Sequence, residues 1–196
     1  ILSMLMLGLV NQLLEVSKVK SGIGDPGWRT GDLVACLRMI VESNQPYTRA
    51  KQISLRFISS ETEVIMDFVP EYLHKIIGNL LSNAIKFTPK EGQVVVRMVR
   101  NGNSVMIRVA DTGCGIADSD LPDIFNAFYQ GENGVKEAGT GIGLSMVREM
   151  VECMDGRIRV KSQVGIGSEF IITLPLKHGN ASWQQWIAGE ETDWEL

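Results

Sequence analysis

Apolar residues recur at intervals of three and four along several stretches of the chain, the spacing that lets a helix bury one side. The clearest stretch starts at Pro70 and stops before Pro89; proline favours the first position of a helix and cannot continue one. The same spacing predicts helices over residues 32–43 and 144–154. Residues 1–20 carry a wider apolar face than one helix can bury alone. This segment therefore packs either on its own domain or on a partner helix in a bundle.

Alternating apolar and polar residues predict strands between these helices. Asn101-Gly102 predicts a tight hairpin, because both residues tolerate the positive φ values of a two-residue turn. The predicted helices can cover one face of a strand-rich sheet, so we expect an α+β fold. The expected fold is a two-layer sandwich in which a mixed sheet carries helices on one face. An N-terminal bundle-type helix should precede this sandwich in the chain. Strands are predicted over residues 53–58, 64–68, 93–100, 104–110, 157–163 and 168–176.

Glycine and proline divide the chain into segments. Helix propensity falls sharply over residues 22–31, which we interpret as a linker between an N-terminal helix, residues 1–21, and a globular domain, residues 32–176. Residues 177–196 differ in composition, with three tryptophans among acidic residues and glycine. This last segment is either a tail that docks on the domain or a linker to a further domain.

The composition narrows the classes of function. The net charge is -4 and lysine and arginine form no cluster, so we expect no nucleic-acid partner. Cys36, Cys114 and Cys153 form no Cys-x-x-Cys pair, which disfavours a zinc site or a disulfide framework and indicates a reducing cytoplasm. No apolar run reaches the roughly 18 to 20 residues of a membrane span. The chain starts without methionine, and we expect it to be part of a longer protein.

Three polar residues follow one border of the apolar stripe on the helix that starts at Pro70. Asn79, Asn83 and Lys86 are separated by four and three residues, so their side chains point the same way. Two amides and an ammonium group in a row can hold a metal-bound polyphosphate. Alternatively, they are solvated polar positions on an amphipathic helix.

Two glycine-rich turns follow. Asp111 ends a predicted strand, and Gly113 and Gly115 would let backbone approach a ligand closely; alternatively, the Asp111 carboxylate bonds only its own turn. The second turn, residues 139–144, precedes a helix, and backbone amides at a helix start attract phosphate. A dinucleotide-binding fingerprint is the rival interpretation, but it requires a third glycine where Leu144 or Met146 stands.

These motifs, in this order and with Phe125 and Phe128 between them, resemble the ATP-binding domain of sensor histidine kinases. That domain belongs to a superfamily shared with gyrase, the large heat-shock chaperones and MutL. The resemblance implies that Asp111 accepts a hydrogen bond from the adenine amine, that Asn83 coordinates Mg2+ and that Lys86 balances phosphate charge. It also implies that residues 131–138, including Lys136, form a lid. The implied nucleotide-binding residues are Asp111, Gly113, Gly115, Phe125, Phe128, Gly139, Gly141, Gly143 and Leu144.

Asn79 departs from the ATPase branch of that superfamily, which has a glutamate there as general base. An amide cannot accept a proton in that role, so rapid hydrolysis is disfavoured and the γ-phosphate remains for a histidine. His74 and His178 lie in no phosphoacceptor motif, so we expect structural or solvated roles for both. The chain alone should bind ATP without phosphorylating itself.

Residues 13–22 resemble the end of the second helix of the histidine kinase dimerisation hairpin. The implied partners are a phosphoacceptor histidine domain, a response regulator and a second copy, joined through the N-terminal helix. We expect a cytoplasmic domain. The sequence is compatible with a full-length protein that is anchored in the inner membrane and with one that is not. The alternatives are an ATPase of the same superfamily and a nucleotide-binding module without catalysis.

Overall fold

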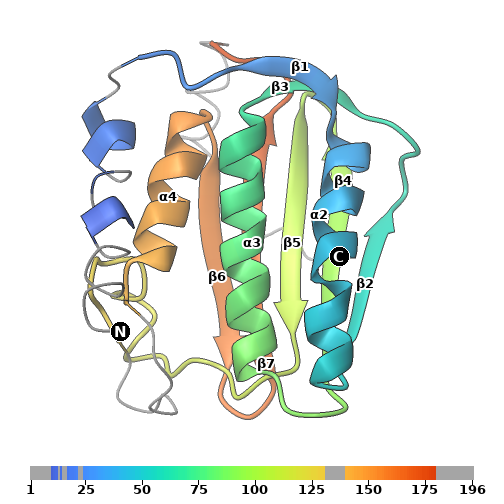
Figure 1. Ribbon diagram of the computed structural model, residues 1–196, viewed down its shortest axis with the longest axis vertical. Helices are drawn as coiled ribbons and strands as arrows, with labels where there is room; N and C mark the ends of the chain where they lie inside the picture. The colour runs from blue at the N-terminus through green and yellow to red at the C-terminus, as the bar shows by residue number, and fades with distance from the viewer. Residues whose placement is uncertain (1–9, 13, 15–16, 22–23, 131–139, 180–196) are drawn as a thin grey trace.

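The computed structural model describes residues 10–12, 14, 17–21, 24–130 and 140–179. Within them, the elements in chain order are β1 (Arg29–Asp32), α2 (Leu33–Ala50), β2 (Ser54–Ser59), β3 (Ile65–Phe68), α3 (Pro70–Phe87), β4 (Gln93–Asn101), β5 (Ser104–Asp111), α4 (Gly143–Cys153), β6 (Arg157–Gln163) and β7 (Gly167–Pro175). Figure 1 shows α2, α3 and α4 side by side in one layer, in front of a sheet that forms the other.

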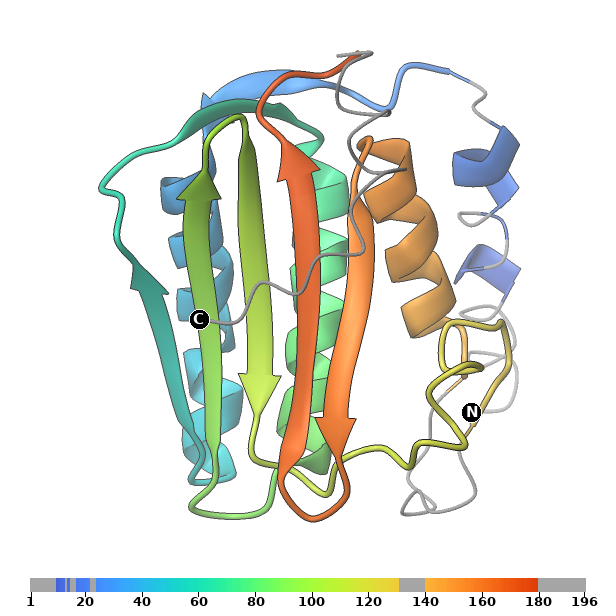
Figure 2. The ribbon, with the colours of Figure 1, turned by 180° about the vertical axis from the view of Figure 1, so that it is seen from behind.

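The main sheet has five strands in the order β2-β4-β5-β7-β6, and β1 pairs with β3 in a separate two-stranded sheet at one end. Strand β2 runs parallel to β4, whereas the other neighbours in the main sheet are antiparallel. No described helix covers the reverse face of the sheet (Figure 2). The predicted two-layer α+β fold, with a mixed sheet and helices on one face, is confirmed.

Helix α3 lies over the middle of the sheet and carries the predicted polar residues. Pro70 occupies its first turn, as predicted, and the helix ends at Phe87, two residues before Pro89. Its apolar stripe is buried against the sheet and the neighbouring helices, which fixes the direction in which its polar border faces. The buried residues are Leu73, Ile76, Ile77, Leu80, Leu81 and Ala84.

Helix α2 is longer than predicted, because it continues through Pro46 to Ala50. Asp32 caps its start by accepting hydrogen bonds from the N–H groups of Val34 and Ala35. Proline usually interrupts a helix. Here the helical turn after Pro46 is stabilised by Thr48, which is buried and whose hydroxyl donates to the Gln45 carbonyl. Tertiary packing thus outweighs the local preference.

Two further details differ from the sequence analysis. Residues Arg29–Asp32 form β1, although residues 22–31 read as a linker. The hairpin turn consists of Gly102 and Asn103, one residue later than predicted, because Asn101 pairs with Ser104 and belongs to β4. Gly102 has the positive φ, 56°, that a tight hairpin turn requires.

The described residues of the N-terminal segment are helical, and Figure 1 shows them beside α4. The Lys20 ammonium lies 3.1 Å from the Glu149 carboxylate on α4. The Gln12 side-chain oxygen accepts a hydrogen bond of 3.1 Å from the Thr140 hydroxyl, just before α4. This helix therefore contacts its own domain. Across the described residues, no helix is long and apolar enough to span a membrane.

Candidate functional site

Asn79 faces the first residue of α4 across the gap between two helices. Its amide nitrogen donates to the Lys75 carbonyl at 2.8 Å, which leaves the amide oxygen to point away from α3. A Cβ placed on Gly143 would lie 2.9 Å from that oxygen. Glycine at the start of α4 therefore permits the close approach of Asn79, and the structure brings these two predicted site residues together.

Asn83 and Lys86 continue the polar border toward the C-terminal end of α3, and both are half-buried. The Lys86 ammonium lies 4.9 Å from the centre of the Phe87 ring. Lys51, at the end of α2, donates to the main-chain carbonyls of Ile85 and Lys86 at 2.7 Å each. The Lys51 ammonium thus caps the end of α3, where the carbonyls lack helical partners and carry partial negative charge.

Asp111 ends β5 as predicted, with a half-buried side chain. Its Oδ1 accepts the Gly113 N–H at 2.8 Å, and the Ser168 N–H also donates to the carboxylate. Burial raises the pKa of the Asp111 carboxyl above its ordinary value, and these two hydrogen bonds offset part of the shift. The carboxylate does bond its own turn, as one interpretation expected, and it is also partly withdrawn from water.

Glycine is needed where the turn after Asp111 contacts its neighbours. A Cβ on Gly113 would lie 2.8 Å from the Phe87 carbonyl oxygen at the end of α3, and a Cβ on Gly115 would lie 2.1 Å from the Gln163 carbonyl oxygen on β6. Gly115 also has a φ of 73°. The turn is therefore pressed between α3 and the β6-β7 hairpin.

Gly167, the first residue of β7, makes a similar contact. A Cβ on Gly167 would lie 1.9 Å from the Asp111 carbonyl oxygen, and its φ is 142°. The hairpin glycines were visible in the sequence, but their closeness to Asp111 follows from the pairing of β5 with β7.

The two phenylalanines have different surroundings. Phe125 is half-buried and meets Phe170 edge-on, with ring centroids 6.3 Å apart, whereas Phe128 is 59% exposed and has a positive φ of 67°. The Phe128 N–H donates to the Gly141 carbonyl at 2.9 Å. Phe125 therefore packs against the hydrophobic core, whereas Phe128 lies at the surface.

The Phe128–Gly141 contact joins the two ends of the segment that the resemblance identifies as a lid. A Cβ on Gly141 would lie 2.8 Å from the Phe128 Cα, and Gly141 has a φ of 70°. Leu144 is half-buried and packs against the core. Gly139 and residues 131–138, including Lys136, lie outside the described residues.

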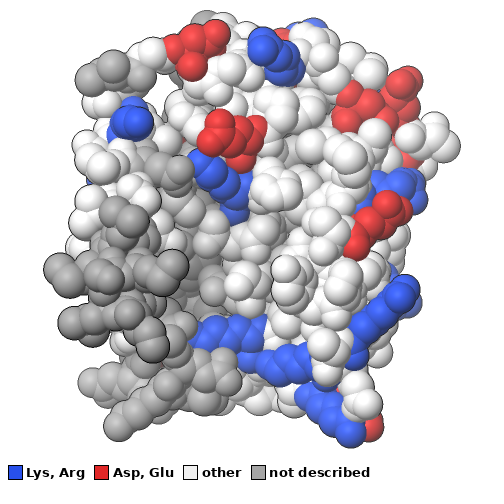
Figure 3. Space-filling model, in the orientation of Figure 1, with Lys and Arg blue, Asp and Glu red and all other residues white. Residues whose placement is uncertain are grey.

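The start of α4 is suited to an anion. No side chain caps this helix and its first turn carries no acidic residue, so its N–H groups present the positive end of the helix dipole. Figure 3 shows lysine and arginine gathered toward the lower end of the helix-covered face, where α2 and α3 end, and most acidic residues nearer the upper end. Both features favour a negatively charged ligand at this side of the molecule.

The donor set also fits a metal-bound polyphosphate. Within the described residues, no group of three or more His, Cys, Asp or Glu side chains is placed to hold a metal ion. Magnesium needs no such cage, because it retains water and shares phosphate oxygens with one or two protein oxygens. The Asn83 amide oxygen is a suitable protein ligand.

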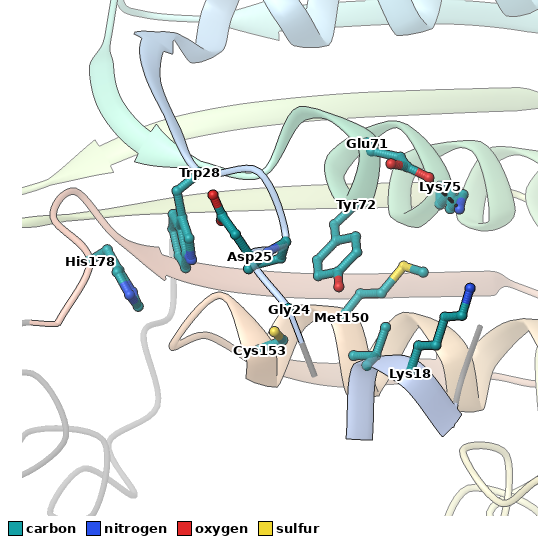
Figure 4. A pocket seen from close by; sticks show the side chains of 12 residues that line it. Lys18, Gly24, Asp25, Trp28, Glu71, Tyr72, Lys75, Met150, Cys153 and His178 are labelled. Atoms are coloured by element: carbon teal, nitrogen blue, oxygen red, sulfur yellow. Dashed lines mark hydrogen bonds and ion pairs between the residues drawn. The ribbon is translucent and has the colours of Figure 1, made fainter. Parts of the chain in front are cut away.

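A cavity of about 460 Å³ lies at the other ends of α3 and α4 (Figure 4). It is lined by residues 18–19 of the N-terminal helix, the segment 24–28, the first turns of α3 and the end of α4. Burial and the neighbouring Asp155 raise the pKa of the Cys153 thiol, which lines it. None of the predicted site residues lines this cavity. It is a junction between the N-terminal helix and the domain, separate from the site described above.

His178 also lines this cavity, and its imidazole stacks on Trp28 with ring centroids 3.8 Å apart. Its Nδ1 lies 2.7 Å from the Asp155 carboxylate. These contacts agree with the structural role expected for His178, while His74 is exposed on α3.

The polar border of α3 and the glycine turns form the two walls of the candidate site. The family model described as "Histidine kinase-, DNA gyrase B-, and HSP90-like ATPase" matches residues 68–178. The chain therefore belongs to this family, as an ATP-binding catalytic domain of the sensor histidine kinase type.

Individual relatives agree with this assignment. The sensor histidine kinase RcsC of Escherichia coli K12 is 35% identical over 177 residues, covering 89% of this chain and 18% of RcsC. The circadian input-output histidine kinase CikA of Synechococcus elongatus is 32% identical over 175 residues, covering 87% of this chain and 23% of CikA. The chain thus spans roughly a fifth of the length of these curated relatives.

Solved structures share the fold. Full-length ShkA in complex with AMPPNP is 29% identical and superposes with a TM-score of 0.77, covering 87% of this chain and 35% of ShkA. The catalytic domain of histidine kinase ThkA is 22% identical, with a TM-score of 0.69, covering 76% of this chain and 98% of ThkA. The resemblance noted in the sequence is confirmed at the level of family and fold.

Proposed function

We propose that this domain transfers the γ-phosphate of ATP to a histidine outside the chain, as the catalytic portion of a sensor histidine kinase in two-component signalling. The observation that carries the proposal is Asn79, whose amide oxygen faces the start of α4. A general base for water would have to act from this position, and an amide cannot accept the proton. The γ-phosphate is therefore kept from rapid hydrolysis.

The nucleotide lies between the two walls in this proposal. Asp111 accepts the hydrogen bond of the adenine amine, and the amides of Gly141 and Gly143 and the start of α4 face the phosphates. Asn83 supplies an amide oxygen to Mg2+, and Lys86 balances phosphate charge. Guanine would turn a carbonyl toward the buried Asp111 carboxylate, so GTP should bind more weakly by on the order of 1 to 3 kcal/mol or more.

The partners follow from the same assignment. The N-terminal helix is the end of a dimerisation hairpin whose other helix carries the phosphoacceptor histidine, and two copies pair through the hairpin. A response regulator then receives the phosphoryl group. The domain works in the cytoplasm, and an inner-membrane anchor in the full-length protein is compatible with this arrangement.

The test is phosphotransfer in the full-length protein with γ-labelled ATP and Mg2+. We expect acid-labile label on a histidine upstream of this chain, none on the chain alone, and loss of label in Asn83→Ala. Asn79→Glu should raise phosphate release, with Asn79→Gln as the control that keeps an amide. Steady phosphate release by the unmodified chain would support a superfamily ATPase instead. ATP binding without any transfer in the full-length protein would support a non-catalytic module.

A further inference from the structure

The reverse face of the main sheet differs from the face under the helices. Side chains alternate along each strand, so Val94, Val96 and Met98 of β4 face the helices and are fully buried, whereas the residues between them face the other way. No described helix lies over this reverse face (Figure 2). We call it the outer face; its residues on β2, β4, β5, β7 and β6 are Arg56, Ile58, Val95, Arg97, Val99, Met106, Arg108, Ala110, Glu169, Ile171, Thr173, Arg157, Arg159 and Lys161.

Positive charge dominates the outer face. In the strand register, Arg97 stands beside Arg108, and Ile171 stands beside both Arg108 and Arg159, so arginines and apolar residues share one row across the sheet. Glu169 is the only acidic residue of the outer face within the described strands, and it lies 3.7 Å from Arg108. The face thus combines cations with exposed or half-buried apolar side chains, for example Ile58, which is 37% exposed.

The chain supplies a segment of matching chemistry. The sequence after Gly179 contains no lysine, arginine or histidine and carries four acids, Glu190, Glu191, Asp193 and Glu195, with Trp183, Trp186 and Trp194. Tryptophan accepts both apolar contact and the guanidinium of arginine on its ring face. Acidic and aromatic side chains together are what the outer face can bind.

Residues 180–196 also start near the end of a central strand and are long enough to reach across the outer face. The described chain ends at Gly179, four residues after the end of β7, which lies in the main sheet between β5 and β6. An extended chain over residues 180–196 spans at most roughly 55 Å, whereas the nine residues of β7 span roughly 30 Å. The segment can therefore cross the whole length of the sheet.

We propose that residues 180–196 dock on the outer face, with their tryptophans over the apolar and arginine side chains and their acids against the cations. This contact covers the sheet face that the described elements leave open. It does not depend on the proposed phosphotransfer, because none of its residues belongs to the nucleotide site.

Acrylamide quenching of tryptophan fluorescence in the 196-residue chain tests the proposal, because three of its four tryptophans lie in this segment. A synthetic peptide of residues 180–196 provides the exposed reference. We expect weaker quenching in the chain than in the peptide. The difference should shrink as NaCl rises from about 0.1 M to about 1 M, because the Debye length falls from roughly 10 Å to roughly 3 Å.

Charge reversal makes the test specific. Arg97→Glu combined with Arg159→Glu should shift the docking equilibrium roughly tenfold toward the open state and increase quenching. The control is Arg49→Glu, which reverses an exposed charge on the last turn of α2, away from the outer face. Glu190→Lys combined with Glu191→Lys should also release the segment from the outer face. Combining all four substitutions places the new lysines opposite the new glutamates and should restore part of the protection of the tryptophans from acrylamide.

Two outcomes would overturn the proposal. One is quenching in the unmodified chain equal to that of the peptide. The other is an Arg97 and Arg159 variant that behaves like Arg49→Glu. If the first outcome is found together with heparin binding that is lost in Arg97→Glu, the outer face binds a separate polyanion and the docking proposal is wrong.

Discussion

The two walls of the proposed nucleotide site are built in different ways. One wall is α3, whose polar residues hold their directions because a buried apolar stripe fixes the whole helix. The other wall consists of turns whose backbone is pressed against α3, β6 and Phe128, with glycine at each point of contact. The first wall offers side chains at fixed helical positions, and the second offers backbone amides together with the Asp111 carboxylate. Substitutions on α3 and at Asp111 should therefore act through lost side-chain chemistry, and substitutions at the turn glycines through steric exclusion.

The largest effect should come from Asp111→Ala, which removes a side chain from the turn wall. Loss of a charge-assisted hydrogen bond to adenine should weaken ATP binding on the order of a hundredfold. Calorimetric titration with AMPPNP and Mg2+ would measure the change in Kd. Retention of the original affinity with an intact fold would show that Asp111 does not hold the purine.

A matched pair of glycine substitutions compares the walls directly. Gly143→Ala places a methyl group 2.9 Å from the Asn79 amide oxygen, whereas Gly78→Ala on α3 meets no atom within 4 Å. We expect Gly143→Ala to weaken nucleotide binding roughly tenfold, because Asn79 and the start of α4 must separate. Gly78→Ala should leave binding unchanged and raise the free energy of unfolding by about 0.5–1 kcal/mol. Equal Kd values for the two variants would contradict the difference between the walls.

Lys51→Met tests how firmly the end of α3 is held. Removing the ammonium leaves the Ile85 and Lys86 carbonyls without this donor. The free energy of unfolding should fall by roughly 1–2 kcal/mol, with a severalfold loss of ATP affinity, since Lys86 belongs to the released turn. Urea denaturation and titration would measure both quantities, and Lys90→Met, an exposed lysine in the turn after α3, is the control. Identical results for the two variants would show that the Lys51 cap is energetically unimportant.

The smallest effect should be a pH dependence set by Asp111. Burial raises the pKa of its carboxyl in the folded domain, so protonation is easier in the folded than in the unfolded state. Asp111 therefore lowers the free energy of unfolding at neutral pH, and this loss disappears as pH falls through the raised pKa. The same protonation removes the adenine acceptor, so ATP affinity should decline as pH falls through the raised pKa of Asp111. Asp111→Asn corrects for titration of the nucleotide itself, and an equal decline in that variant would exclude Asp111 as the cause.

Local patterns in the sequence were sufficient for much of the structure. The periodicity of α3 and its flanking prolines predicted the helix and the shared direction of Asn79, Asn83 and Lys86, because helical geometry fixes relative directions within one element. The same is true of Asp111 at a strand end. These features depend on neighbours only a few residues away.

Features that depend on distant partners could not be predicted in this way. Lys51 reaches carbonyls 34 and 35 residues along the chain, and Gly167 contacts Asp111 only because β7 pairs with β5. Strand β1 is four residues long and forms through pairing with β3, so no local pattern revealed it. Helix α2 continues past Pro46 because buried contacts with distant residues outweigh the local preference of proline.

The central claim is that one nucleotide contacts both walls, and an NMR titration of the 15N-labelled chain with AMPPNP and Mg2+ tests it most directly. The account predicts that the side-chain amide signals of Asn79 and Asn83 and the backbone amides of Gly113, Gly141 and Gly143 shift together with one Kd. Shifts confined to α3 alone, or to the turns alone, would contradict it.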